Sequence, residues 1–178
     1  VIMAHIAVLG LGNWGTAIAR LWLQDGHSVN GWTIEDEVYA SIMTDDVNEK
    51  YLPNRSIKGL EVTMRIEDAI HDAEIVVLAV PSAHILDVVE SLLPHLRPGH
   101  VLLDLAKGLA PGKRLISEAI EGMLEANNMS NALAVLTGPT IAPEAADGVM
   151  TTALVASSDL SIATRLANTL TTPTFVLH

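Results

Sequence analysis

His5-Ile6-Ala7-Val8-Leu9-Gly10-Leu11-Gly12-Asn13-Trp14-Gly15-Thr16-Ala17 is the stretch that decides the fold of this 178-residue chain. An apolar strand pattern breaks into G-x-G-x-x-G and leads directly into a helical pattern. In this context Gly10 permits the tight turn, Gly12 lets the backbone approach a pyrophosphate, and Gly15 lets helix and strand pack closely. The first N–H groups of the helix would face the phosphates. The stretch therefore predicts a dinucleotide site.

Strand and helix patterns alternate through the rest of the chain. The helix after Gly15 ends at Asp25-Gly26. Further strands are expected at 28–32, 60–63, 74–80, 100–106, 132–136, 152–156 and 174–177, and further helices at 66–71, 85–93, 115–124 and 159–170. This alternation predicts an α/β, Rossmann-like, doubly wound fold with a mostly parallel sheet and helices on both faces. Residues 1–178 are expected to form a single cofactor-binding domain.

The composition excludes several classes of function. Acids outnumber bases by 21 to 10, so the net charge of -11 argues against binding to nucleic acid. The longest apolar runs, such as 75–80, are far shorter than the ~20 residues of a membrane-spanning helix. We therefore expect a cytoplasmic protein without membrane insertion. The chain has no cysteine and its seven histidines form no ligand pattern, so no metal site is expected.

Residues that directly follow the strands are candidate site residues, because ligands bind at the carboxyl ends of parallel strands. Asn13 can offer an amide to a phosphate, and Trp14 either forms a wall of the site or packs in the core. Glu35 lies 20 residues after Gly15, where an acid that binds the ribose 2′-OH is expected. Alternatively, Glu35 is an ordinary surface charge, and Asp36 or Glu37 could take its place. Since no Arg or Lys stands near this point, NAD is favoured over NADP.

The later strand ends add a cation and small polar groups. Pro81 would start a helix and bring backbone to the inner ribose. Lys107 ends a buried strand, where a cation can neutralise a phosphate or polarise a carbonyl; otherwise it extends to the surface. Gly138 permits a close approach, and Thr140 offers a hydroxyl.

Six motifs in this order carry a resemblance that covers nearly the whole chain. They are Gly10–Ala17, Gly26–Val29 with Trp32, Asn48–Pro53, Val80–Ser82, Lys107-Gly108 and Gly138–Glu144. With them the chain resembles the N-terminal domain of NAD(P)-dependent glycerol-3-phosphate dehydrogenases. That family interconverts dihydroxyacetone phosphate and sn-glycerol 3-phosphate with NAD(P)H, in the service of phospholipid synthesis.

The resemblance implies roles for individual residues. Asn13, Trp14 and Ala142 would contact the cofactor, and Lys107 would contact both cofactor and substrate as the candidate catalytic residue. Gly138 and Thr140 would bind the phosphorylated substrate. A basic residue often found after the second strand is replaced here by Thr33-Ile34-Glu35, which supports the NAD preference.

The family continues into a helical C-terminal domain with a general acid/base lysine, and this domain is absent from the 178 residues. The chain alone is therefore expected to bind cofactor and to be weakly active or inactive. Two alternatives stay open: a cofactor-sensing module without catalysis, and a domain of a hydroxy-acid or ketopantoate-type dehydrogenase. A homodimer also stays open.

Overall fold

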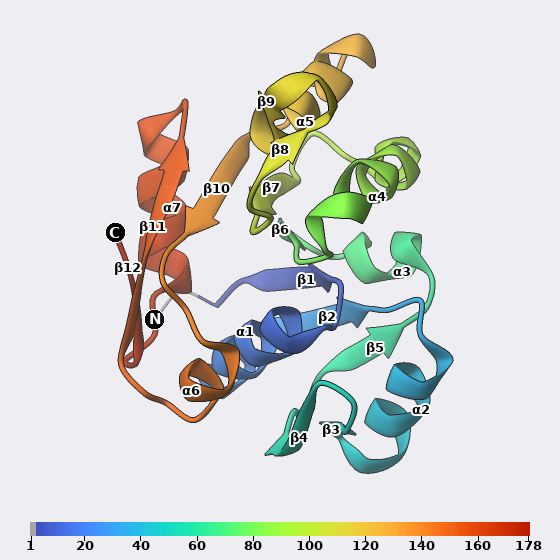
Figure 1. Cartoon of the computed structure of the whole chain (residues 1–178), viewed down its shortest axis with the longest axis vertical. Coiled ribbons are helices and arrows are strands. Elements are labelled where there is room, and N and C mark those ends of the chain that lie inside the picture. Colours follow the sequence, from blue (N-terminus) through green and yellow to red (C-terminus); the bar gives the residue numbers. More distant parts are fainter. Residues whose placement is uncertain (1–2) are drawn as a thin grey trace.

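The computed structural model describes residues 3–178 and is built around one eight-stranded sheet (Figure 1). Its strands are β1 (His5–Leu9), β2 (Ser28–Trp32), β5 (Glu61–Thr63), β6 (Ile75–Leu78), β7 (Val101–Asp104), β10 (Leu133–Thr137), β11 (Thr151–Ser157) and β12 (Phe175–Leu177). They stand in the order β12-β11-β10-β7-β6-β1-β2-β5. Strands from both ends of the chain thus share one sheet.

The sheet is mostly parallel, as predicted. β1 pairs in parallel with β2 and β6, and parallel pairing continues outward to β5 on one side and to β10 on the other. β11 is antiparallel to β10, and β12 follows the direction of β11. The reversal at this edge is a feature that the sequence patterns did not predict.

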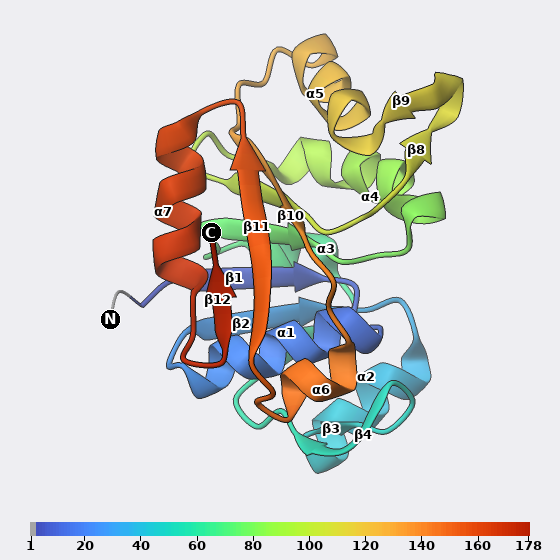
Figure 2. The same cartoon turned by 60° about the vertical axis from the view of Figure 1, so that its left-hand side comes forward.

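Helices cover both faces of the sheet, which confirms the doubly wound prediction (Figures 1 and 2). One face carries α1 (Asn13–Gln24) and α7 (Leu160–Leu170), and the other carries α3 (Ile66–Ile70), α4 (Ile85–Leu92) and α5 (Ile116–Ala126). Side chains alternate along β1, so Ile6 and Val8 join the first core while Ala7 and Leu9 join the second. Burial on both faces explains why the strands are continuously apolar.

Several short elements were not predicted from the sequence. They are α2 (Asp36–Asp45), the hairpin of β3 (Val47–Asn48) and β4 (Leu52–Ser56), the hairpin of β8 (Leu109–Ala110) and β9 (Arg114–Leu115), and α6 (Ala142–Ala146). Three single 3-10 turns lie at Ser82–His84, Leu93–His95 and Pro111–Lys113. β6 and β7 are shorter than expected, because each begins one residue later and ends two residues earlier than the predicted strand. These early exits shape the site described below.

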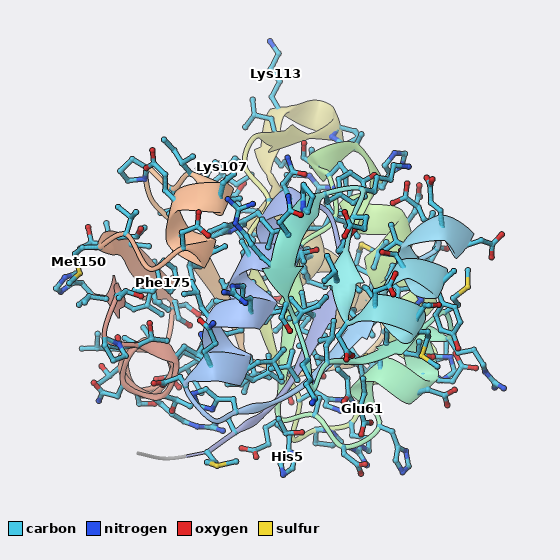
Figure 3. The ribbon with its side chains drawn as sticks, turned by 90° about the horizontal axis from the view of Figure 1, so that it is seen from below. His5, Glu61, Lys107, Lys113, Met150 and Phe175 are labelled. Carbon is cyan, nitrogen blue, oxygen red and sulfur yellow. The ribbon has the colours of Figure 1, made fainter. Side chains whose placement is uncertain are left out.

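The two ends of the strands are separated clearly in Figure 3, where His5 and Glu61 mark strand starts and Lys107 lies at the opposite side. Trp22 of α1 is fully buried, and its indole N–H donates to the carbonyl of Leu170 at the end of α7, at 3.0 Å. This bond joins the first helix to the last. Within residues 3–178, no helix combines the length and apolarity needed to span a membrane.

Candidate functional site

A cleft of about 720 Å³ opens where the carboxyl ends of β1, β2, β6 and β7 meet. The strand order reverses between β1 and β6, and such a switch point is where open α/β sheets bind ligands. Of the residues predicted for the site, Gly10, Gly12, Asn13, Trp14, Glu35, Pro81 and Lys107 line this cleft. The fold therefore gathers residues from four strand ends into one cavity.

The three glycines of the first turn meet different surroundings. Gly10 has a φ of +106°, and its N–H donates to the carbonyl of Trp32 at 3.0 Å. A Cβ built on Gly15 would lie 1.9 Å from the carbonyl oxygen of Gly10, whereas a Cβ on Gly12 would meet nothing within 4 Å. Gly15 thus serves helix–strand contact, and Gly12 faces open space.

The start of α1 offers free backbone donors to that space. Its N-cap is Gly12, no side chain caps the N–H groups, and the first turn holds no acid. An uncapped helix N-terminus carries a partial positive charge that favours phosphate. The residues present therefore suit a dinucleotide.

The buried side chain of Asn48 stabilises the glycine turn after β1 through hydrogen bonds. The side-chain amide of Asn48 donates to the carbonyl of Leu11 and to the hydroxyl of Thr16, each at 2.9 Å. Buried amides need such partners. The Asn48–Pro53 motif was noticed in the sequence, but no role was assigned to Asn48 there.

Trp14 satisfies both interpretations of its role. It lines the cleft, and it also packs on the core with an edge-to-face contact to Phe175, at 5.8 Å between ring centroids and 79° between planes. The C-terminal strand thereby supports one wall of the cleft.

Glu35 lies at the cleft and contacts Lys50 and Tyr51, which are 15 and 16 residues away in the sequence. Lys50 Nζ lies 2.8 Å from Glu35 Oε1, and the Tyr51 hydroxyl donates to the same oxygen at 3.0 Å. The expectation that no base stands near this point is therefore wrong, because the turn between β3 and β4 brings Lys50 back onto Glu35. Lys50 holds the pKa of Glu35 below its usual value, and the Glu35 carboxylate raises the pKa of Tyr51.

Lys107 is exposed at the cleft, and its Nζ donates to the carbonyl of Gly138 at 3.0 Å. It thus bridges the ends of β7 and β10. Asp104, the last residue of β7, is 1% exposed, and its Oδ1 accepts from the N–H of Ala106 at 2.8 Å. Burial raises the pKa of Asp104 to about 6.

Three further residues predicted to bind substrate or cofactor, Gly138, Thr140 and Ala142, are not among the residues that line the cleft. Gly138 directly follows β10, and a Cβ built on it would lie 3.0 Å from Ala153 Cα. Thr140 lies in the segment that leads to α6. Ala142 starts α6 and packs with Trp14 on a small cluster of Ala17, Leu52 and Ala146.

The sequence patterns missed some residues of the cleft. Tyr51 belongs to a motif that was recognised without a role, and His84 lines the cleft although a helix-surface position was favoured for it. Thr33, directly after β2, is buried and also lines the cleft. Within the described part of the chain, no cluster of three potential metal ligands occurs.

The family profile described as the N-terminus of NAD-dependent glycerol-3-phosphate dehydrogenase matches residues 5–163. The chain belongs to this family. The resemblance inferred from its motifs is therefore confirmed.

Several glycerol-3-phosphate dehydrogenases are similar to this chain in sequence or in structure. The enzyme named glycerol-3-phosphate dehydrogenase [NAD(P)+] from Koribacter versatilis is 38% identical over 99% of this chain and 53% of its own length. The Corynebacterium urealyticum enzyme of the same name is 36% identical over 88% of this chain and 47% of its own. The crystal structure of the Coxiella burnetii glycerol-3-phosphate dehydrogenase matches with a TM-score of 0.89 and 26% identity, over 99% of this chain and 53% of that one. The chain thus spans about half the length of these relatives.

Proposed function

We propose that this chain is the cofactor-binding half of an NAD(P)-dependent glycerol-3-phosphate dehydrogenase. The reaction would transfer a hydride between the nicotinamide and dihydroxyacetone phosphate to give sn-glycerol 3-phosphate. The observation that carries the proposal is the meeting of an open glycine turn, Glu35 and Lys107 around one cleft of the size of a cofactor site.

In this proposal the first two strand ends bind the cofactor. The N–H groups at the start of α1, with Asn13, hold the pyrophosphate, and Gly12 keeps the approach free. Glu35 accepts a hydrogen bond from the ribose 2′-OH. Trp14, Pro81 and Ala142 contact the cofactor from the sides. When bound, the nicotinamide supplies the hydride, which no side chain can supply.

Lys107 is the residue we assign to the reacting end. Its ammonium would move from the Gly138 carbonyl to the substrate, where it neutralises phosphate charge or polarises the carbonyl. Gly138 and Thr140 would then contact the substrate with backbone and hydroxyl groups. The proton of the reaction would come from the helical domain of the family, so the 178-residue chain is expected to turn over weakly or not at all by itself.

Calorimetric titration with NADH tests the binding half of the proposal, and an assay with NADH and dihydroxyacetone phosphate tests the other half. We expect binding by the chain alone and turnover only after a family C-terminal domain is fused or added. Absence of NADH binding would overturn the proposal. Binding without turnover in the fused protein would instead favour a cofactor-sensing module.

Lys107→Met separates the roles at the reacting end. We expect a large loss of turnover in the fused protein with a small change in NADH affinity, because the lysine acts mainly on the substrate. An equal loss of both, or no loss, would contradict this assignment. Lys113→Met, at an exposed lysine in the β8–β9 turn that Figure 3 shows pointing away from the body, is the matched control.

A further inference from the structure

Four side chains form what we call the Glu35 cluster: Glu35, Glu37, Lys50 and Tyr51. Lys50 Nζ donates to Oε1 of Glu35 at 2.8 Å and also to the carboxylate of Glu37. The same ammonium lies 5.4 Å from the centroid of the Tyr51 ring. Two of the four, Glu35 and Tyr51, line the cleft. A single cation is therefore shared by two carboxylates at the edge of the cofactor site.

The geometry leaves Glu35 with spare accepting capacity. Both of its contacts, from Lys50 and from Tyr51, reach Oε1. A carboxylate accepts several hydrogen bonds, so Oε2 remains as a further acceptor at the cleft. Its side chain is one-third exposed, which places it at the mouth of the cleft rather than in the core. This arrangement suits a donor such as a ribose hydroxyl.

A 2′-phosphate would meet different forces at the same place. It brings close to two negative charges to a cluster in which Glu35 and Glu37 are already negative, and like charges at short range repel. Lys50 is the cation of this cluster, and its flexible stem lets the ammonium turn from a carboxylate to a phosphate. Its 40% exposed side chain has room for that movement.

On the basis of the proposed function, we infer that Lys50 is the specificity-determining residue that lets this site accept a 2′-phosphorylated cofactor beside the unphosphorylated one. With a 2′-hydroxyl bound, Lys50 stays on Glu35 and Glu37. With a 2′-phosphate bound, Lys50 pairs with the phosphate. Discrimination between the two cofactors is then a balance between Glu35, which favours the hydroxyl, and Lys50, which admits the phosphate.

A purely structural role for Lys50 makes a different prediction. The same contacts tie the segment after β3 to the start of α2, and loosening that segment would disturb Tyr51 and the cleft for any nucleotide. Both cofactors would then lose affinity by the same factor. The ratio of the two affinities separates the roles.

The experiment is calorimetric titration of the 178-residue chain with NADH and with NADPH, for the wild type, Lys50→Met, Glu35→Gln and the control Lys58→Met. Lys58 is an exposed lysine in the turn between β4 and β5. For Lys50→Met we expect about tenfold weaker NADPH binding, since a charge-assisted contact is lost, and less than about threefold change for NADH. For Glu35→Gln we expect weaker NADH binding and tighter NADPH binding. Lys58→Met should change neither.

The outcomes distinguish this inference from the proposed function. A wild type that binds neither cofactor overturns both. A wild type that binds NADH and shows no NADPH binding overturns only the inference, and so does a Lys50→Met variant whose two affinities fall by the same factor or stay unchanged. Thermal unfolding of each variant, measured beside the titrations, shows that the affinities refer to folded protein.

Discussion

At the scale of single residues, Gly12 and Gly15 of the first turn are expected to serve different purposes, Gly12 cofactor binding and Gly15 folding. Nothing lies within 4 Å of a Cβ at Gly12, whereas a Cβ at Gly15 would collide with the backbone of Gly10 at 1.9 Å. Gly12→Ala should therefore keep the fold, apart from a small change at the helix cap, and lose at least about tenfold in NADH affinity. Gly15→Ala should destabilise the protein by about 2 kcal/mol or more.

Chemical denaturation and NADH titration of both variants check this pair. A Gly12→Ala protein that binds NADH as well as the wild type would show that the pyrophosphate does not approach this backbone. A Gly15→Ala protein of normal stability would show that α1 shifts freely, contrary to the close contact described.

Asp104 gives a pH-dependent prediction. Burial raises its pKa from 3.8 to about 6, so the folded state holds the proton more tightly than the unfolded state. The resulting stability is present below pH 3.8 and is lost as the pH rises through 6. The loss amounts to about 3 kcal/mol at most. Asp104→Asn keeps an acceptor for the Ala106 N–H and should be more stable than the wild type at pH 8, with little difference at pH 4.

Denaturant unfolding at the two pH values measures the effect, with Glu90→Gln on the exposed side of α4 as the control acid. A difference between Asp104→Asn and the wild type that is the same at pH 4 and pH 8 would contradict it.

At the scale of elements, the five-residue helix α6 depends on contacts with distant segments. Arg55 of β4 donates to both carboxylate oxygens of Asp147, at 2.7 and 2.8 Å, and Arg20 of α1 donates to the carbonyl of Ala146 at 3.1 Å. A helix of this length is not stable by itself. This ion pair and this hydrogen bond therefore hold the segment that follows Gly138 and Thr140.

Arg55→Met should consequently raise amide hydrogen exchange in residues 139–148 and leave exchange in β1 and β6 unchanged. The pair is exposed, so global unfolding should change little. Exchange that stays the same in 139–148 would show that packing on α1 suffices. Arg65→Met, which breaks an exposed ion pair to Glu67, is the matched control.

The elements also show where sequence patterns succeed. The buried strands and the helices with regular apolar spacing were predicted because periodicity reports burial. The two-residue strands of the β8–β9 hairpin are too short for any period, and nothing local reveals that β11 reverses direction. For the site, the strand-end rule located Glu35 and Lys107, but Lys50 follows β3 and reaches Glu35 only through tertiary folding. The contact between Lys50 and Glu35 was therefore hidden from the sequence.

At the scale of the whole molecule, the net charge of -11 repels an approaching anionic ligand over long range. The cleft itself, in contrast, offers the positive charge of Lys107 and a helix N-terminus. Salt screens such long-range repulsion, since the Debye length falls from about 30 Å at 0.01 M to about 8 Å at 0.15 M. The association rate of NADH should therefore rise with ionic strength over this range. Stopped-flow mixing measures it, and a falling rate would mean that the local positive charge dominates.

The position of β1 in the middle of the sheet has a consequence for synthesis. Ile6 pairs with Val29 on one side and with Ile75 on the other. The edge of β1 that faces β6 therefore stays unpaired while the ribosome adds the roughly 70 residues between Ile6 and Ile75. At 5–20 residues per second this delay is roughly 3 to 14 s. An unpaired apolar strand is open to wrong partners during such an interval. β1 is thus synthesised early but gains its second neighbouring strand late. The need for chaperones should be greatest before β6 emerges from the ribosome.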